Sequence, residues 1–424
     1  MEEWKEYKAS EFCESVTDGT HDSPKSKDKG FYLITSKHLK DSYIDFASAK
    51  FISREDYQKV IQRSKVEQYD VLFSMIGTIG NTLRVTSPKI EFAVKNMGIF
   101  KFGGNNLNSK WFYYWLKSPK AKEYIKSRLS GSTQSYLTLN SLRDFPVLCP
   151  DNKTKKDIIS ILSSLDDKIE LNRRINENLE QQAQALFKSW FVDFEPFKGG
   201  KFVDSELGMI PEELIISRIG DIPHTIESGR RPKGGAVLKG VPSIGAENIK
   251  GLGYYDYSKT KYIPEDFALT TNRGKVYGYE LLIYKDGGKP GYFIPNYTIF
   301  GEGFPFDEMY INEHVFQLDF MSKEYNVFAY FYMQTPYIMN QLNSIGGKAA
   351  IPGINTKDVE SLPIFNGDNK KIQEFGNLVL PMITTILRNC RENARLAQLR
   401  DTLLPRLMSG ELAITDVDDR SIFQ

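Results

Sequence analysis

The stretch from Ile158 to Trp190 reads IISILSSLDDKIELNRRINENLEQQAQALFKSW and decides the fold. Its apolar residues recur at alternating steps of four and three, a pattern sustained over more than four heptads. Such a seam is typical of a helix that pairs with another helix in a coiled coil. Asparagines on a seam fix register and partner number at some cost in stability. The seam consists of Ile158, Leu162, Leu165, Ile169, Asn172, Asn176, Leu179, Ala183, Leu186 and Trp190.

A second seam begins near Lys370 and again steps by three and four. Pro381 lies inside it, which predicts a kink or a break because proline removes a backbone donor. Pro405 predicts the end of this helix. The second seam consists of Ile372, Phe375, Val379, Met382, Ile386, Asn389, Asn393 and Leu396.

Two matching seams in one chain favour an intramolecular, antiparallel pair of helices. Helices of about 35 residues are roughly 50 Å long. Two other arrangements stay open. Each helix packs on the segment that precedes it, or it pairs with a second copy of the chain in a homodimer.

The segments that precede the two helices repeat each other. Ile34–Lys40 corresponds to Ile244–Lys250 at an offset of 244 − 34 = 210. Further on, Asn140 matches Asn355 at an offset of 355 − 140 = 215. Both segments consist of short β-rich runs separated by Gly, Asn, Ser and Pro, which is typical of strands and turns. A duplicated unit of this kind suggests a pseudo-twofold object that engages something with two ends.

We therefore predict an α+β protein. Two globular α/β heads are separated by two long helices that form an intramolecular antiparallel coiled coil with pseudo-twofold symmetry. One helix is expected near Ser109–Leu129 inside the first head. The predicted divisions are 1–150 for the first head, 151–195 for the first helical region, 196–212 for a linker, 213–365 for the second head, 366–412 for the second helical region and 413–424 for a tail.

The composition excludes several classes of protein. The 55 Lys and Arg balance the 54 Asp and Glu, so bulk charge does not argue for a nucleic-acid partner. Three scattered cysteines fit a reducing compartment and provide no disulfide framework. The four histidines form no metal-spaced set with them. No run approaches ~18 apolar residues, so we expect a soluble, cytoplasmic protein.

Catalytic motifs are also missing from the sequence. There is no Walker loop, no dinucleotide-binding glycine turn and no nucleophile elbow. Pro150-Asp151 followed by Asp166-Asp167-Lys168 resembles the pattern of Mg²⁺-dependent nucleases. That chemistry requires carboxylates that converge from adjacent strands. The second element lies inside the heptad helix, so we interpret the match as coincidence.

Two turns at equal places in the heads carry side chains suited to nucleic acid. Thr20 and Lys25 are phosphate-type donors, whereas Arg230 and Arg231 suit guanine edges or phosphates. Ordinary solvated turns are the competing interpretation. The full set of candidate DNA contacts is Thr20, His21, Lys25, Lys37, His38, Thr133, Gln134, Ser135, Arg230, Arg231, Lys233, Asn248, Lys289 and Lys348.

With these features together, the chain resembles a known family, the specificity subunits of type I restriction–modification systems. The first signature is Thr17-Asp18-Gly19-Thr20-His21. The second runs from Ala185 to Pro196 after the first helix, and the third from Leu399 to Leu412 at the end of the second. The resemblance covers the chain from Trp4 to Leu412 and departs inside the heads, so it does not give the DNA sequence that is recognised.

The resemblance implies two target-recognition domains, each of which reads half of a bipartite site in double-stranded DNA. The helices would space the halves and dock two methyltransferase subunits, which restriction subunits join. This chain would then be non-catalytic and hold no cofactor or metal, with S-adenosylmethionine, ATP and Mg²⁺ on the partner subunits. The expected coil and partner residues are Leu165, Ile169, Asn172, Asn176, Leu179, Leu186, Trp190, Met382, Ile386, Asn393, Leu396 and Leu403.

Two rival functions stay open from the sequence. The first is an enzyme, a nuclease or methyltransferase in its own right, which would cut or methylate DNA alone. The second is a coiled-coil scaffold whose heads bind protein rather than DNA. A mobility shift with bipartite DNA in the presence of methyltransferase subunits separates them.

Overall fold

The computed structural model describes residues 4–40, 43–131, 135–289, 291–347 and 352–412. Contacts divide the chain into two compact units, one of residues 1–167 with 397–424 and one of residues 168–396. Both long helices pass from one unit to the other. Each unit therefore contains one head and a part of both helices.

The two predicted helices are present as α6 (Asn152–Phe191) and α11 (Lys370–Ser409). Asp151 caps the start of α6, because its Oδ1 accepts the backbone N–H groups of Lys153 at 2.7 Å and Thr154 at 3.1 Å. A side-chain acceptor at this position satisfies donors that have no partner inside the helix. Both apolar seams are thereby carried on continuous helices.

The two helices pair within the chain and run antiparallel. In the second unit, Asn172 Nδ2 donates to Asn393 Oδ1 at 2.9 Å, and Asn389 Nδ2 donates to Asn176 Oδ1 at 2.8 Å. Rising numbers on α6 thus meet falling numbers on α11. This arrangement confirms the predicted fold class of α/β heads joined by an intramolecular coiled coil.

The break expected as one alternative at Pro381 does not occur, and the helix end expected at Pro405 is wrong. The helix α11 runs through Pro381 without a break, and it continues for four residues beyond Pro405 to Ser409. Pro381 is exposed, so the carbonyl that loses its helical partner faces solvent rather than the core. Pro405 does not end the helix because the following turn buries Leu407 and Met408.

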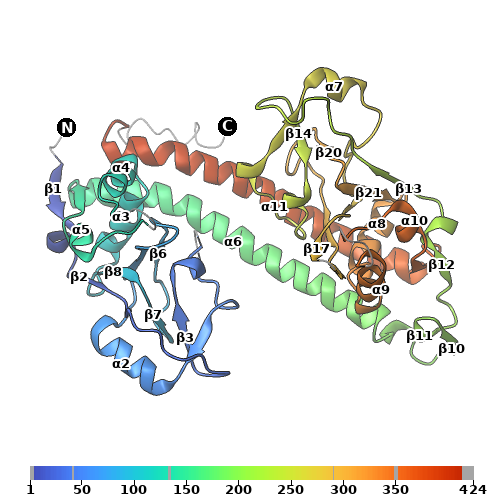
Figure 1. Cartoon of the computed structure of the whole chain (residues 1–424), viewed down its shortest axis with the longest axis horizontal. Coiled ribbons are helices and arrows are strands. Elements are labelled where there is room, and N and C mark those ends of the chain that lie inside the picture. Colours follow the sequence, from blue (N-terminus) through green and yellow to red (C-terminus); the bar gives the residue numbers. More distant parts are fainter. Residues whose placement is uncertain (1–3, 41–42, 132–134, 290, 348–351, 413–424) are drawn as a thin grey trace. The chain divides into compact units, whose positions relative to one another are not determined.

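The first head contains two sheets and a short strand pair (Figure 1). The four-stranded sheet has the order β2-β8-β5-β6 and is antiparallel, whereas the three-stranded sheet β4-β3-β7 contains a parallel pair, β3 with β7. Strand β1 pairs with β9 next to the start of α6. The elements are β1 Lys5–Lys8, α1 Ala9–Phe12, β2 Ser15–Asp18, β3 Phe31–Ile34, η1 Ser36–His38, β4 Lys50–Ile52, α2 Arg54–Ser64, β5 Val71–Ser74, β6 Thr82–Arg84, β7 Phe92–Val94, β8 Met97–Lys101, α3 Asn106–Leu116, α4 Pro119–Ser127, α5 Leu139–Arg143 and β9 Pro146–Cys149.

The second head has the same order of strands. Its sheets are β13-β21-β16-β19 and β15-β14-β20, and β12 pairs with β22 as β1 pairs with β9. The elements are η2 Glu195–Phe197, β10 Phe202–Ser205, β11 Gly208–Pro211, β12 Ile216–Arg218, η3 Ile219–Asp221, β13 Thr225–Ser228, β14 Val241–Ile244, η4 Ala246–Asn248, η5 Tyr257–Lys259, β15 Lys261–Ile263, α7 Glu265–Thr270, β16 Leu281–Tyr284, β17 Gly288–Lys289, β18 Tyr292–Phe293, β19 Asn296–Ile299, β20 Tyr310–Ile311, β21 Val315–Asp319, α8 Lys323–Tyr332, α9 Pro336–Gly346, α10 Thr356–Glu360 and β22 Pro363–Phe365.

The repeat seen in the sequence is a repeat of structure, although its offset changes along the chain. Strands β5 and β16 begin at Val71 and Leu281, an offset of 281 − 71 = 210. The parallel pairs match Ile34 with Val94 and Ile244 with Ile311, so the offset has become 311 − 94 = 217. The match of Asn140 with Asn355 is therefore corrected. The side chain that caps α5 as Asn355 caps α10 is that of Thr138, at 355 − 138 = 217.

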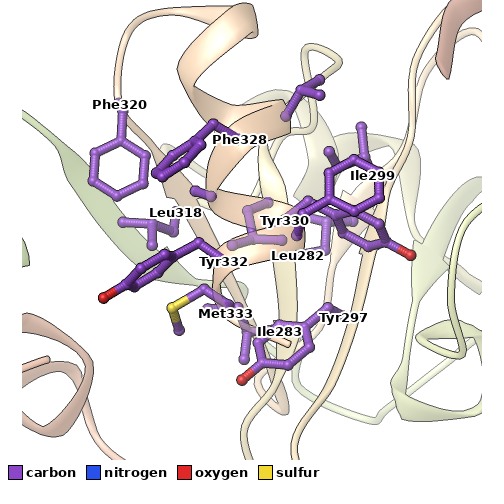
Figure 2. Close-up of a cluster of buried hydrophobic side chains, with 14 of the residues drawn as sticks. Leu282, Ile283, Tyr297, Ile299, Leu318, Phe320, Phe328, Tyr330, Tyr332 and Met333 are labelled. Carbon is purple, nitrogen blue, oxygen red and sulfur yellow. The ribbon is translucent and has the colours of Figure 1, made fainter. Parts of the chain in front are cut away.

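The core of the second head lies between its four-stranded sheet and α8. Figure 2 shows Phe328, Tyr330 and Tyr332 of α8 among strand residues such as Leu282 and Ile299. Phe187 of α6 joins this core, with its ring centroid 5.8 Å from that of Phe328. The helix segment of the second signature is thus an anchor that holds this head on α6 and α11.

One smaller expectation needs correction. The helix expected near Ser109–Leu129 is two helices, α3 and α4, because Pro119 takes the first position of α4 and Ser118 caps it. The predicted linker contains a short strand pair. Strands β10 and β11 form an antiparallel hairpin around Gly208, whose φ of 90° suits glycine.

Candidate nucleic-acid interface

Each head holds its candidate turn close to a neighbouring strand by means of a glycine. A Cβ on Gly19 would lie 2.4 Å from the carbonyl oxygen of Val94, and one on Gly229 would lie 1.7 Å from that of Ile311. No side chain fits at either position. The glycines therefore fix where the next two residues of each turn lie, which are Thr20 and His21 in the first head and Arg230 and Arg231 in the second.

In the first head the turn is organised around a buried carboxylate. The Asp18 side chain is 7% exposed; its Oδ1 accepts from Arg63 Nη2 at 2.6 Å, and its Oδ2 lies 3.0 Å from His21 Nε2. The other ring nitrogen of His21 lies 2.8 Å from Asn96 Oδ1. His21 is thus held on both sides while 62% of its side chain stays exposed. A buried acid with two partners fixes an exposed ring in one place.

In the second head, a series of neighbouring charged side chains occupies the equivalent place. Arg231 Nη1 lies 3.8 Å from Glu313 Oε1, which lies 3.6 Å from His314 Nε2. His314 Nδ1 in turn lies 2.7 Å from Asp286 Oδ2. These side chains are one-third or more exposed, so each ion pair contributes little stability. Their effect is on the position and charge of the surface that Arg231 presents.

The pairs His21–Asn96 and Arg231–Glu313 are structural equivalents. Arg231 is 231 − 21 = 210 residues after His21, and Glu313 is 313 − 96 = 217 residues after Asn96, as the strand registers require. Two residues connect β7 to β8, whereas three connect β20 to β21. The extra residue is His314. One site therefore exists in both heads with different chemistry in each.

The structure places two candidates inside the heads rather than on their surfaces. His38 in η1 is 2% exposed, and its Nδ1 accepts the backbone N–H of Thr35 at 2.9 Å. Burial, aided by the charge of Lys37, lowers the pKa of His38. Asn248 in η4 is 1% exposed, and its Oδ1 accepts the backbone N–H of Asp256 at 2.9 Å. We therefore remove His38 and Asn248 from the candidate direct contacts, because their polar atoms face the interior.

The other candidates are on the surface or outside the described residues. The exposed ones are Lys25, Lys37, Ser135, Arg230 and Lys233. Thr20 is half-buried, and its Oγ1 accepts the backbone N–H of Asp22 at 3.1 Å. Thr133, Gln134 and Lys348 lie outside the described residues, as does the side chain of Lys289.

The predicted seam residues line the helix pair. Among these residues, Leu165, Asn172, Ile386 and Leu403 are buried. The remaining members are half-buried, which is usual where only two helices meet. They are Ile169, Asn176, Leu179, Leu186, Trp190, Met382, Asn393 and Leu396.

The nuclease-like carboxylates do not converge. Asp151 caps the start of α6, whereas Asp166 lies fifteen residues further along the same helix, or about 22 Å at ~1.5 Å per residue. Asp166 instead holds the helices and head together in the first unit. Its Oδ1 accepts from Arg400 Nη1 at 2.7 Å, and its Oδ2 accepts from the hydroxyl of Tyr114 at 2.8 Å. No His, Cys, Asp and Glu cluster suited to a metal occurs among the described residues.

Several residues of the site were missed in the sequence. Asp18 lies within the first turn but does not look buried, and Arg63 and Asn96 are distant in sequence. The internal repeat holds a signal for Asn96, since a match at 217 pairs it with Glu313. That signal becomes visible only when the second head is allowed seven extra residues between β16 and β20, because the offset is 210 at the start of β16 and 217 at β20.

The chain contains two copies of one mixed head and a shared helix pair. Because the turns of the two heads carry different charges, the chain presents two different surfaces for recognition. A family model described as the type I restriction modification DNA specificity domain matches residues 1–181. The MjaIX specificity subunit of Methanocaldococcus jannaschii is 28% identical over 88% of this chain and 86% of its own length. The HindI specificity subunit of Haemophilus influenzae is 25% identical over 82% of this chain and 88% of its own. By sequence, this chain is similar to the DNA specificity subunits of type I restriction–modification systems.

The fold has a solved relative as well. The S subunit of a type I restriction–modification system from M. genitalium superposes with a TM-score of 0.54, at 15% identity, over 95% of this chain and 96% of its own. At this identity the similarity concerns the fold. Within the described residues, no helix is long and apolar enough to cross a membrane.

Proposed function

We propose that this chain selects the DNA site of a type I restriction–modification complex, with each head reading one half of a bipartite sequence in double-stranded DNA. The observation that carries the proposal is the pair of equivalent sites with different chemistry, His21–Asn96 and Arg231–Glu313. Two identical surfaces would read two identical half-sites. Surfaces that differ at one equivalent position suit an asymmetric site.

Phosphate contacts would position each head, and a few base contacts would give it specificity. The exposed cations of the two turns, Lys25, Arg230 and Lys233, suit the backbone. Arg231 suits the O6 and N7 acceptors of guanine, because a guanidinium presents two parallel donors. Two heads that each bind DNA weakly gain affinity when they are on one chain, because binding of the first head raises the effective concentration of the second head at its half-site.

The paired helices α6 and α11 would space the two half-sites and dock two methyltransferase subunits. Restriction subunits would join these in the full complex. The chemistry of S-adenosylmethionine, ATP and Mg²⁺ then belongs to the partners. Asp166 of the nuclease-like pattern supports that division, because its two carboxylate oxygens accept hydrogen bonds from Arg400 and Tyr114.

A binding selection with random duplexes tests the proposal. The chain is assembled with its methyltransferase subunits and challenged with a library that contains two randomised blocks. We expect enrichment of two different half-sites at one fixed spacing. The variant Arg231→Ala should relax one half-site and leave the other unchanged, whereas Lys239→Ala, an exposed cation on the same head, should change neither. Enrichment of a single block, or of none, contradicts the proposal.

A further inference from the structure

The site around His21 contains a hollow whose chemistry fits one base better than the others. The hollow has a volume of about 420 Å³ and lies where the first turn, the end of β5 and the segment before α5 meet. Most of its wall is apolar. The lining residues are Asp18, His21, Met75, Ile76, Asn96, Tyr136, Leu137, Thr138 and Leu139.

The polar groups of the hollow are largely used by one another. Both carboxylate oxygens of Asp18 have partners, and both ring nitrogens of His21 have partners. Asn96 Oδ1 faces His21, which leaves the amide N–H₂ of Asn96 as a donor at the rim. The hollow therefore offers an apolar wall with the donor group of Asn96 at its rim.

The corresponding place in the second head has lost this apolar wall. Ile76 and Tyr136 form a strand bridge in the first head, and Asp286 and Gly353 form the same bridge in the second. An aspartate replaces the isoleucine, and a glycine replaces a tyrosine that is 40% exposed. Asp286 also begins the series of charged side chains that leads to Arg231. The apolar wall is a property of the first head alone.

We propose that the hollow takes the major-groove edge of a thymine. Thymine presents a C5-methyl group next to the O4 acceptor, whereas cytosine presents a donor and the purines present N7 with O6 or an amino group. The methyl group would lie against Ile76 and Tyr136, and the Asn96 amide would donate to O4. Lys25 and Lys95 on the flanking loops supply positive charge for the phosphates. The proposal rests on the proposed function, since it requires that the first head binds DNA.

Deoxyuridine tests the proposal because it differs from thymidine only by the methyl group. The site is first mapped by sequencing methylated DNA, and the mapped duplex is then made with one thymine at a time replaced by uracil. We expect one replacement in the half-site of the first head to weaken binding by about fourfold, which is ~0.8 kcal/mol, the usual contribution of one buried methylene. Uracil elsewhere in the site should change binding by less than twofold.

Two variants assign the effect to the hollow. Ile76→Asp, which introduces the residue of the second head, should abolish the uracil effect, and Tyr277→Asp, at an 82% exposed position of the other head, should retain it. Asn96→Asp replaces the amide by a carboxylate of similar shape and so removes the donor. Aspartate, like asparagine, tolerates the φ of 54° at this position. It should reduce the preference for thymine over cytosine at the same position by about tenfold.

The outcomes are distinguishable from those that test the function itself. Sequence-specific binding in which no single uracil replacement matters overturns the proposal and leaves the proposed function standing. The same holds if a uracil effect is found but persists in Ile76→Asp, or if Asn96→Asp leaves the preference for thymine over cytosine unchanged. Absence of sequence-specific binding to any duplex overturns the proposed function.

Discussion

Gly19 and Gly229 show how single residues set the recognition surface. Each lets a turn pass against a neighbouring strand at a distance that excludes a Cβ. The residues that follow, His21 and Arg231, are then free to differ between the heads because the backbone beneath them is fixed. The glycine thus sets the backbone conformation of each turn, and the residue two positions later sets the chemistry of its surface.

Replacement of Gly229 by alanine should destabilise the second head by about 3 kcal/mol, because a Cβ placed 1.7 Å from a carbonyl oxygen forces the backbone apart. Urea denaturation of the purified chain measures the effect. Gly234→Ala is the matched control, since its Cβ would meet nothing within 4 Å and only its φ of 93° is strained. Equal stability of the two variants would show that the close approach is unimportant.

A second residue-scale prediction concerns Glu280, which is 3% exposed and accepts the backbone N–H groups of Tyr277 and Gly278, each at 2.7 Å. Burial raises the pKa of Glu280 above 4.5. The folded state then binds this proton more tightly than the unfolded state. Stability from this group is complete below pH 4.5 and is lost as the pH rises through the raised value.

The measurement is the free energy of unfolding of the wild type and of Glu280→Gln across pH 4 to 8. The advantage of the wild type should be largest at the acid end. It should shrink by about 1.4 kcal/mol for each pH unit between the unfolded and the folded pKa of Glu280. Glu308→Gln, in an exposed ion pair of the same head, serves as control and should leave the slope unchanged. A wild-type advantage that grows with pH contradicts the assigned direction.

At the scale of elements, four asparagines form a polar layer inside the helix pair. Asn172 and Asn389 are related by 389 − 172 = 217, as are Asn176 and Asn393 by 393 − 176 = 217. Asn172 is 1% exposed and also donates to Glu392 Oε2 at 2.6 Å. A buried polar layer of this kind aligns two helices, since any slip leaves its groups without partners.

Leucine substitutions test this layer. Asn172→Leu alone should cost about 1–3 kcal/mol, because it leaves the polar partners on α11 unsatisfied. The double variant Asn172→Leu, Asn393→Leu should recover most of that loss. Thermal unfolding of the four members of the cycle measures the coupling, and Asn178→Leu at an exposed position of α6 is the control. Additive losses would mean that the two asparagines do not interact.

These elements also show what the sequence allowed us to predict. The heptad seams predicted both helices, because apolar periodicity is a local signal over forty residues, and they favoured an intramolecular pairing without excluding the alternatives. They did not give the continuity of α11 through Pro381, since an exposed carbonyl tolerates the loss of one helical bond. Nor did the repeat identify Asn96 as part of the site, because its contact with His21, 75 residues earlier in the chain, depends on strand register.

For the whole molecule, the paired helices act as a ruler under the proposed function. Insertion of one heptad into both α6 and α11 keeps the seams and lengthens the pair by about 10 Å. At ~3.4 Å per base pair, the non-specific spacer should grow by about three base pairs with both half-sites unchanged. Mapping of methylated sites gives the spacer directly. Altered half-sites at constant spacing contradict the ruler.

The central claim is that the two heads read DNA independently. Exchange of residues 4–150 for the first head of a related subunit, followed by genome-wide mapping of methylated sites in cells that also express the methyltransferase subunits, tests it most directly. We predict that one half-site changes and that the other half-site and the spacer stay as they were. A change in both half-sites, or in neither, would contradict the division of recognition between the heads.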